Sequence, residues 1–215
     1  KLFFLFLSFL FAVIVIFLFR PEYFIDDIEI FIKDQVSSST NGEIIIGNID
    51  GNFVQGFRLN EVVYQEEGLI IFSAGNIYID PDLSRIITGK IALSQLVINN
   101  SYYNYDIQKS ESQILPDKSS LINWRFYISS LLIEKSLFVY KESIYKINGD
   151  LKFEYNNGTQ IDISVLNVQS LNFSSPLVLS DGIIRWYNDE WIISNLTAQS
   201  EWLSGKIDGT LNLNK

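Results

Sequence analysis

The sequence predicts a mainly β protein, in which an N-terminal transmembrane helix and an amphipathic helix precede a long, curved antiparallel β-sheet that forms an open groove. Three observations predict this fold: an apolar run at the start of the chain, a second segment with helical spacing of its apolar residues, and alternating apolar and polar residues from Glu43 onward. The predicted divisions are the membrane helix (1–20), the amphipathic helix and linker (21–41), a first groove segment (42–105), a polar loop or insertion (106–120) and a second, truncated groove segment (121–215).

The apolar run extends from Leu2 to Phe19, is interrupted only by Ser8 and is closed by Arg20-Pro21. At ~1.5 Å per residue it covers roughly 27 Å, close to the hydrocarbon thickness of a bilayer. The alternative, a cleavable secretory signal, has an apolar core of about 7–15 residues that ends in small residues. The stretch from Val15 to Tyr23 is bulky throughout, which favours an uncleaved anchor.

Charges around this run predict its orientation. Lys1 precedes it, and acidic residues follow soon after Arg20, so the basic bias favours a cytoplasmic N-terminus and places the bulk of the chain outside the cytoplasm. The missing Met at position 1, and an end at Lys215 inside an apparent strand, suggest a fragment of a longer protein.

The next segment predicts an amphipathic helix. Pro21 suits the first turn of a helix, and the polar run from Ser37 to Gly42 ends it. The apolar stripe consists of Ile25, Ile28, Ile32 and Val36, broadened by Phe24 and Phe31. Such a helix either lies on the membrane surface or packs against the end of a sheet. Because a surface-binding helix is usually rich in Lys and Arg and this one is acidic, the second arrangement is favoured.

From Glu43 onward the spacing is that of strands, and we expect about a dozen of them, all antiparallel. The alternation is clearest at Leu151–Tyr155, Ile161–Val165 and Leu211–Leu213. Similar runs are Glu43–Ile49, Leu69–Phe72, Asn76–Asp80, Lys90–Asn99, Leu131–Tyr140, Leu177–Trp186 and Trp191–Thr197. The expected hairpin turns are Asp50-Gly51, Asn157-Gly158, Asp181-Gly182 and Asp208-Gly209.

Short phrases recur along the strands without a fixed period. Ile49-Asp50-Gly51, Ile147-Asn148-Gly149-Asp150-Leu151 and Ile207-Asp208-Gly209-Thr210-Leu211 share one pattern at unequal separations. A solenoid of uniform coils is thereby excluded, and loose repetition of a hairpin unit remains.

Composition excludes several classes of function. The chain has no Cys and no His, so disulfides, thiol chemistry, imidazole catalysis and the commonest zinc sites are unavailable. A formal charge of −9 argues against nucleic acid as a partner. Asp80-Pro81-Asp82 provides far too few ligands for calcium, and Asp82 is expected to cap a short helix. We predict no metal, no cofactor, no catalytic residue and no enzymatic activity.

The decisive question is what covers the apolar side of the sheet. A second sheet or a closed barrel would make that side an ordinary core, whereas a curved open sheet would leave an apolar trough that needs an occupant. The predicted lining residues, which a filled core would bury instead, are Ile77, Ile79, Ile91, Leu93, Leu151, Phe153, Ile161 and Ile163. The aromatic residues Trp124, Trp186, Trp191, Trp202, Tyr102, Tyr103 and Tyr105 either mark the lip of the trough or pack ordinarily.

A resemblance favours the trough. The residues that carry it are Gly47-Asn48-Ile49-Asp50-Gly51-Asn52-Phe53, Leu59-Asn60-Glu61-Val62, Gly68-Leu69-Ile70-Ile71, Ala74-Gly75-Asn76-Ile77-Tyr78-Ile79 and Asp82-Leu83-Ser84-Arg85-Ile86-Ile87-Thr88-Gly89-Lys90-Ile91. In this order they resemble the N-terminal region of the TamB (translocation and assembly module) family and its AsmA-like relatives. The match covers Gly47 to Ile98, and the insertion at 106–120 departs from the family pattern.

The resemblance implies a repeating β-groove protein anchored in the bacterial inner membrane through residues 2–19, as a single-pass protein with its bulk in the periplasm. Its implied partners are phospholipid acyl chains, which move along the trough toward the outer membrane, and an outer-membrane β-barrel of the Omp85 type. An alternative role attached to the same family is assembly or secretion of outer-membrane β-barrel proteins and autotransporters. A structural or adhesive β-domain on a membrane stalk is the third possibility.

Overall fold

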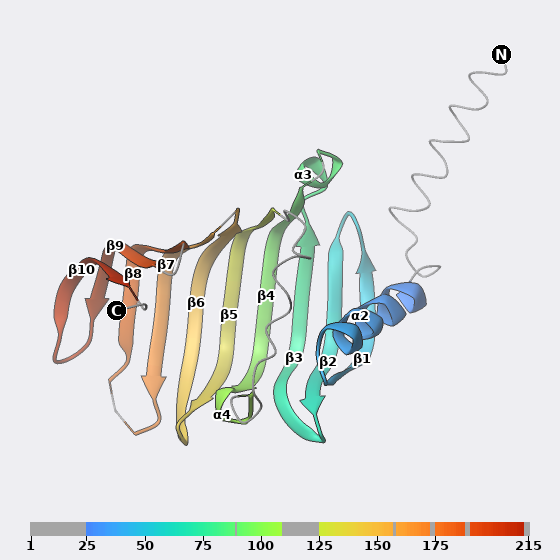
Figure 1. Ribbon diagram of the computed structural model, residues 1–215, viewed down its shortest axis with the longest axis horizontal. Coiled ribbons are helices and arrows are strands. Elements are labelled where there is room, and N and C mark those ends of the chain that lie inside the picture. The colour runs from blue at the N-terminus through green and yellow to red at the C-terminus, as the bar shows by residue number, and fades with distance from the viewer. Residues whose placement is uncertain are drawn as a thin grey trace, which may run out of the picture.

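The computed structural model describes residues 25–88, 90–108, 125–156, 158–172, 175–187 and 190–212. Its ten strands form one sheet in which the spatial order equals the chain order (Figure 1). The strands are β1 (Glu43–Asn52), β2 (Gly56–Glu66), β3 (Leu69–Pro81), β4 (Ile91–Asn104), β5 (Phe126–Tyr140), β6 (Ser143–Tyr155), β7 (Thr159–Ser170), β8 (Leu177–Tyr187), β9 (Glu190–Gln199) and β10 (Ser204–Asn212). Within the described residues β1 and β10 are the two edges of the sheet. The prediction of a mainly β chain with a long open sheet is therefore confirmed.

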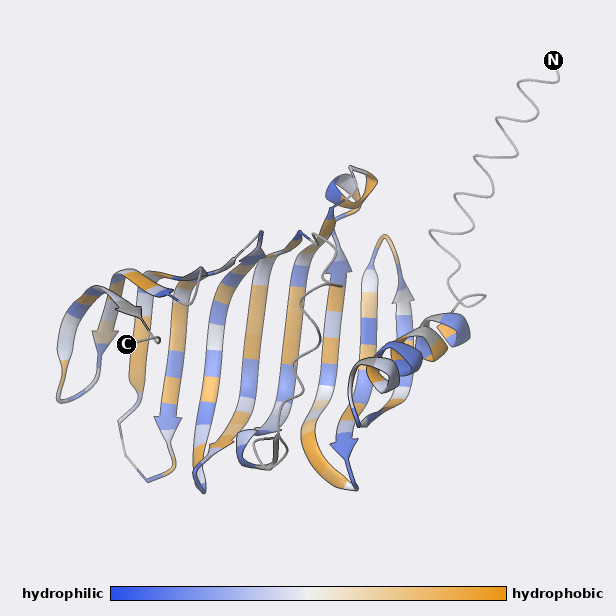
Figure 2. Ribbon diagram, in the orientation of Figure 1, coloured by the Kyte–Doolittle hydropathy of each residue, from blue (hydrophilic) through white to orange (hydrophobic). Residues whose placement is uncertain are grey.

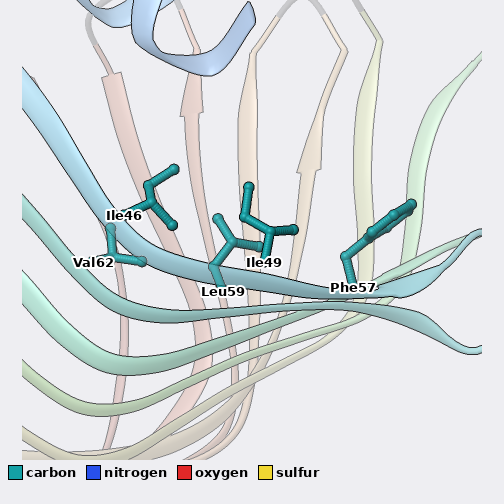
Figure 3. Packing of buried hydrophobic residues seen from close by; sticks show 5 residues of the cluster. All are labelled: Ile46, Ile49, Phe57, Leu59 and Val62. Carbon is teal, nitrogen blue, oxygen red and sulfur yellow. The ribbon is translucent and has the colours of Figure 1, made fainter. Parts of the chain in front are cut away.

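Helix α2 (Ile25–Ser39) lies across the β1 end of the sheet (Figure 1). Its Ile25 and Ile32 pack against a buried cluster from β1 and β2, whose members are Ile46, Ile49, Phe57, Leu59 and Val62 (Figure 3). Beyond the helix, the N–H of Thr40 donates to the carbonyl oxygen of Val36 at 2.9 Å. Of the two arrangements open from the sequence, the structure has the helix packed against the sheet.

The segment predicted to cross a membrane, residues 2–19, lies outside the described residues. Where the structure does describe the chain, its helices are too short or too polar to cross a bilayer.

Strands β4 and β5 pair in parallel, which corrects the prediction of a wholly antiparallel sheet. A parallel pair requires a connection of a dozen or more residues, and the polar stretch after β4 provides it. This connection starts with the short helix α4 (Tyr105–Gln108), and most of the predicted insertion at 106–120 lies outside the described residues. The chain thus returns to the end of the sheet from which β4 began.

Only one of the four predicted turn pairs lies where a turn is found, because Gly158 falls between β6 and β7. Asp50-Gly51, Asp181-Gly182 and Asp208-Gly209 lie inside strands instead. Among the described residues, tight hairpins are made by Glu67-Gly68 and Lys141-Glu142, which have positive φ at both central positions, as type I′ turns require.

Candidate functional site

A line of residues in left-handed backbone conformation crosses the middle of the sheet. These residues, which we call the crease, are Glu61 (φ 53°), Asn100 (φ 56°), Lys135 (φ 50°), Asp181 (φ 56°) and Asn195 (φ 55°). Glu61 lies between the paired positions Asn60–Asn76 and Val62–Ala74, and Asn100 lies opposite the same part of β3. The crease therefore bends neighbouring strands at matching positions.

The crease changes the spacing of residues that face one side of the sheet. Along β2 the buried apolar side chains are those of Phe57 and Leu59, two residues apart, and then that of Val62, three residues further on. Along β9 the corresponding step is from Ile193 to Leu196. An extra residue at the bend keeps apolar side chains on the same face, although strict alternation would have turned them to the other one.

Polar side chains on the neighbouring strand accept hydrogen bonds from the backbone N–H groups of two residues in the crease. The Oδ1 atom of Asn148 accepts a hydrogen bond from the backbone N–H of Lys135 at 2.7 Å, and Oδ1 of Asp208 accepts one from Asn195 at 2.6 Å. Asn148 and Asp208 occupy the same place in the two longer recurring phrases. Those phrases therefore mark the bend of a strand rather than a hairpin turn.

The strand register brings apolar residues of different strands side by side, because directly paired residues lie on the same face of a sheet. One row crosses all ten strands and contains only aliphatic residues and glycines; Figure 2 shows the alternation along each strand that produces it. Its members are Ile49, Leu59, Ile77, Ile98, Ile133, Gly149, Leu166, Leu179, Ala198 and Gly205.

Three further rows lie on the same face, toward the short helix α3 (Leu83–Ile87). The first consists of Phe57, Ile79, Leu96, Leu131, Leu151, Ile163 and Gly182. The second consists of Pro81, Leu93, Ile128, Phe153, Ile161, Ile184, Ile193 and Gly209. The outermost consists of Ile91, Phe126, Tyr155, Thr159, Trp186 and Trp191.

Two rows continue the face beyond the crease. One consists of Ile46, Val62, Ala74, Ser101, Ser136, Ile147, Val168 and Leu177, in which the hydroxyl of Ser101 donates to that of Ser136 at 2.6 Å. The other is largely aromatic and consists of Ile44, Tyr64, Phe72, Tyr103, Phe138, Tyr145 and Ser170. We call the six rows together the apolar face.

All eight residues predicted to line a groove lie on the apolar face. Ile77 belongs to the row that crosses all ten strands and Ile91 to the outermost row. The members of the two rows between them are Ile79, Leu93, Leu151, Phe153, Ile161 and Ile163. The rows beyond the crease were not predicted, because a spacing of three interrupts the strand pattern from which they could have been found.

Exposure differs across the apolar face. Leu151 and Ile163 are 7% and 4% exposed, among neighbours from the same face, whereas Ile91 and Trp186 are 37% and 42% exposed. The central rows therefore contain well-buried side chains, whereas the outermost row is more exposed, and we call this row the rim. On that rim the rings of Trp186 and Trp191 are stacked, with centroids 5.9 Å apart.

The aromatic residues named in the sequence analysis do not lie together in one part of the structure. Trp186, Trp191 and Tyr103 lie on the apolar face, whereas Tyr102 pairs with Ser73 and Leu137 on the opposite face. Trp202 is 81% exposed and lines a cavity of about 350 Å³ together with Tyr145, Val168 and Leu177. Tyr105 contacts Phe138 from α4, and Trp124 lies outside the described residues.

The opposite face carries a row of polar side chains, which are Asn48, Asn60, Asn76, Asn99 and Glu134. The amide of Asn76 donates to Oδ1 of Asn60 at 2.8 Å, and that of Asn99 donates to Oε2 of Glu134 at 3.1 Å. These cross-strand hydrogen bonds pair the polar groups of the opposite face with one another. The polar row lies one residue along each strand from the row that crosses all ten strands.

Titratable groups of the described residues form no metal site, since they contain no cluster of three or more potential ligands. Asp82 caps α3 instead, accepting from the Ser84 hydroxyl at 2.5 Å and from the backbone N–H of Arg85 at 3.1 Å. These hydrogen bonds hold the pKa of the Asp82 carboxyl below its usual range. Burial raises the pKa of the Tyr103 hydroxyl above its usual range.

Comparison of the chain with protein-family models, curated proteins and solved structures finds no match.

Proposed function

We propose that the protein is an inner-membrane-anchored periplasmic β-groove protein, which moves phospholipid between the inner and outer membranes along its apolar face. The observation that carries the proposal is the row of aliphatic residues and glycines that continues across ten strands of a single sheet. Within the described residues no second sheet faces it. Large continuous apolar surfaces in proteins usually have an apolar occupant.

The energetics of lipid transfer support this use of the face. Each CH₂ group exposed to water costs about 0.8 kcal/mol, so an acyl chain that crosses the periplasm unshielded meets a prohibitive barrier. Ten strands at about 4.8 Å spacing give a face on the order of 45 Å across. Acyl chains would lie against this face while headgroups remain in water.

The anchor and the location belong to the same proposal. The apolar run at 2–19 would hold the protein in the inner membrane, with the sheet in the periplasm. The resemblance of Gly47 to Ile98 to the TamB and AsmA-like pattern supports this arrangement, and an outer-membrane β-barrel would be the receiving partner.

Site-specific photocrosslinking of the full chain in cells, followed by mass spectrometry of the adducts, tests the proposal. A crosslinker at Phe153 or Ile161 should capture phospholipid, whereas the same group at exposed Ser164, next to Ile163 on β7, should not. Lipid captured equally at the three positions, or at none of them, would rule out transport along this face.

Substitution provides the functional arm of the test. Phe153→Glu and Ile161→Glu should disturb the lipid balance of the envelope while the circular dichroism spectrum of the sheet is retained, because a charge interrupts the apolar path. Ser164→Glu introduces the same charge one residue from Ile163 and should leave the lipid balance unchanged. Unfolding by the first two substitutions would instead identify these residues as ordinary core.

A second candidate function is assembly of outer-membrane β-barrel proteins. The observation that favours it is β10, an edge strand whose residues from Ser204 to Thr210 are exposed. Such an edge can pair with an added strand of another protein. A crosslinker at Lys206 that captures outer-membrane polypeptide, together with no lipid capture at Phe153, would favour this function over lipid transport.

A further inference from the structure

A cavity of about 350 Å³ lies on the apolar face, on the side of the crease away from α3. Four of its seven lining residues belong to the two rows beyond the crease. Tyr145 and Ser170 pair with each other in the largely aromatic row, and Val168 and Leu177 pair in the row next to it. The cavity is therefore part of the apolar face itself, where β7 ends and β8 begins.

Two connections between strands complete the cavity. Ser175 lies just before β8, and Ser200 and Trp202 lie between β9 and β10. Because Gln199 pairs with Val178, the residues next to them, Ser200 and Leu177, come opposite each other. The register thus brings the connection between β9 and β10 to the edge of the cavity.

Hydrogen bonds hold the second connection in place. The N–H of Ser200 donates to the carbonyl oxygen of Leu203 at 2.7 Å, and its Oγ accepts from the N–H groups of Trp202 at 3.3 Å and Leu203 at 3.1 Å. The hydroxyl of Ser175 donates to Oε2 of Glu201 at 2.9 Å, which links the two connections. Trp202 is thus fixed beside the cavity although it is 81% exposed. Since Trp side chains are highly buried on average, an exposed one at an apolar cavity indicates an occupant.

The lining selects an uncharged, apolar occupant. Among the described residues, none of the side chains that line the cavity is charged, and its three serine hydroxyls already take part in hydrogen bonds within the protein. Those of Ser175 and Ser200 bind within the two connections, and Oγ of Ser170 accepts from the N–H of Asn172 at 3.3 Å. The carboxylate of Glu201 next to the cavity disfavours a phosphate or a carboxylate there, because like charges repel.

A line of aromatic rings leads from the cavity along the apolar face. The ring centroid of Tyr145 lies 6.5 Å from that of Phe138, and the Phe138 ring is stacked on that of Tyr103 with centroids 5.6 Å apart. These three residues come from β6, β5 and β4. An acyl chain on the largely aromatic row would therefore reach the cavity without leaving apolar surface.

We infer that this cavity, which we call the Trp202 cavity, holds the methyl end of one acyl chain of a lipid bound on the apolar face. The inference rests on the proposed function and adds the place at which an acyl chain ends. The volume lies at the lower end of the usual range for ligand cavities of about 300–1,000 Å³, and apolar cavities take up apolar molecules rather than water. The indole of Trp202 contacts the chain end and is itself removed from water, which adds to the affinity.

Photolabelling of the full chain in vesicles of phosphatidylethanolamine and phosphatidylglycerol tests the inference. One probe is phosphatidylcholine with a diazirine at the methyl end of one acyl chain, and the other carries the diazirine on its headgroup. Mass spectrometry of peptides identifies the labelled residues. The variants are Trp202→Ala and Trp202→Phe, with Leu203→Ala as the control, because Leu203 is an exposed apolar residue of the same connection and does not line the cavity. Thermal unfolding of each variant is compared with that of the unchanged chain.

The methyl-end probe should label Val168 and Leu177, and the headgroup probe should not. Trp202→Ala should reduce this labelling about tenfold, because the largest apolar side chain of the lining is lost, and it should leave labelling of the rows toward α3 unchanged. Trp202→Phe keeps an apolar ring and should retain most of the labelling. Leu203→Ala should change nothing.

Labelling of Val168 and Leu177 that persists unchanged in Trp202→Ala, or that is equal with both probes, would overturn the inference. Absence of label in the cavity would also overturn it, and label at Phe153 and Ile161 would then show that lipid transport along the face stands without the Trp202 cavity. If none of these residues is labelled, the proposed function fails as well. Label confined to the cavity would retain the acyl site and rule out transport along the face.

A photocrosslinking amino acid in place of Trp202 provides a second measurement on the full chain in the same vesicles. A crosslink to lipid is the expected result. A crosslink to another segment of the chain, or to a second copy of it, would overturn the inference, since polypeptide would then cover the cavity.

Discussion

At the scale of single residues, the crease explains both the bend of the sheet and the incompleteness of the sequence pattern. Lys135 is held in a left-handed conformation that costs an ordinary residue about 1–2 kcal/mol. It persists because the N–H of Lys135 donates to Asn148 and because the bend returns Ser136, which is 5% exposed, to the apolar face. The strain is thus offset by packing on the same strand.

Replacement of this residue tests that account. Lys135→Gly should raise the free energy of unfolding by about 0.5–1 kcal/mol, because glycine adopts the conformation without steric cost, although it loses more entropy on folding. Urea unfolding of the full chain in detergent provides the measurement.

Lys146→Gly is the matched control for this replacement. Lys146 lies on the neighbouring β6 strand and has no positive φ, so its replacement should lower the free energy of unfolding by a similar amount. Opposite signs for the two variants are the expected result. A lower free energy of unfolding for both variants would show that the crease is not strained.

At the scale of elements, the connection after β4 also holds the hairpin between β5 and β6 in place. Asp106 of α4 accepts hydrogen bonds from the backbone N–H groups of Lys141 at 2.7 Å and Glu142 at 3.0 Å. These residues form the tight turn between β5 and β6, so α4 fixes this hairpin beside the end of β4. The crossover that makes β4 and β5 parallel is thereby tied to the second half of the sheet.

Removing this carboxylate should destabilise the hairpin. Asp106→Ala should lower the free energy of unfolding by about 1–3 kcal/mol, since two charge-assisted hydrogen bonds to backbone N–H groups are lost. Asp34→Ala on the exposed side of α2 removes a carboxylate that makes no hydrogen bond or ion pair with a described residue, and it should change the free energy of unfolding by less than about 0.5 kcal/mol. Equal effects in thermal or urea unfolding would contradict the role assigned to Asp106.

The elements also show which parts of the fold could be predicted from local pattern. Strict alternation identified the cores of β6 and β7 at Leu151–Tyr155 and Ile161–Val165, and the register pairs their predicted lining residues with one another. Strand β2 was not among the predicted runs, because Glu61 interrupts its alternation. The sequence pattern predicts turns at Asp-Gly pairs, but these pairs lie inside strands. The tendency of Asp and Gly to adopt a left-handed backbone serves a hairpin turn or a bend within a strand equally well.

Register and strand direction could not be predicted in this way, because they depend on residues far apart in the chain. Nothing local to Ile91 or Phe126 indicates that these two residues pair in parallel. The meeting of Lys90 and Arg125 at one end of the sheet depends on that pairing, and it was not predicted for this reason.

At the scale of the whole molecule, the two ends of the sheet differ. Among the described residues, β1 and β10 each have a hydrogen-bonded neighbour on one side only. Helix α2 packs over the β1 end, where Ile46 and Ile49 are buried, whereas Ile207 of β10 is 41% exposed. Helix α2 therefore covers one face of the sheet at the β1 end, whereas the described residues provide no such cover at β10.

This asymmetry predicts the pattern of amide hydrogen exchange in the full chain. Exchange should be slowest in the central strands β5 and β6, intermediate in β1 and fastest in β10, because protection follows hydrogen bonding and local burial. Mass spectrometry of peptides from these strands measures the order.

Ile32→Ser removes an apolar contact between α2 and β1, and it should accelerate exchange in β1 without changing β10. If β10 exchanges as slowly as β5 in the isolated protein, its outer edge is already occupied. Strand addition at that edge would then no longer explain assembly of other β proteins, and the apolar face would remain as the surface through which the molecule acts.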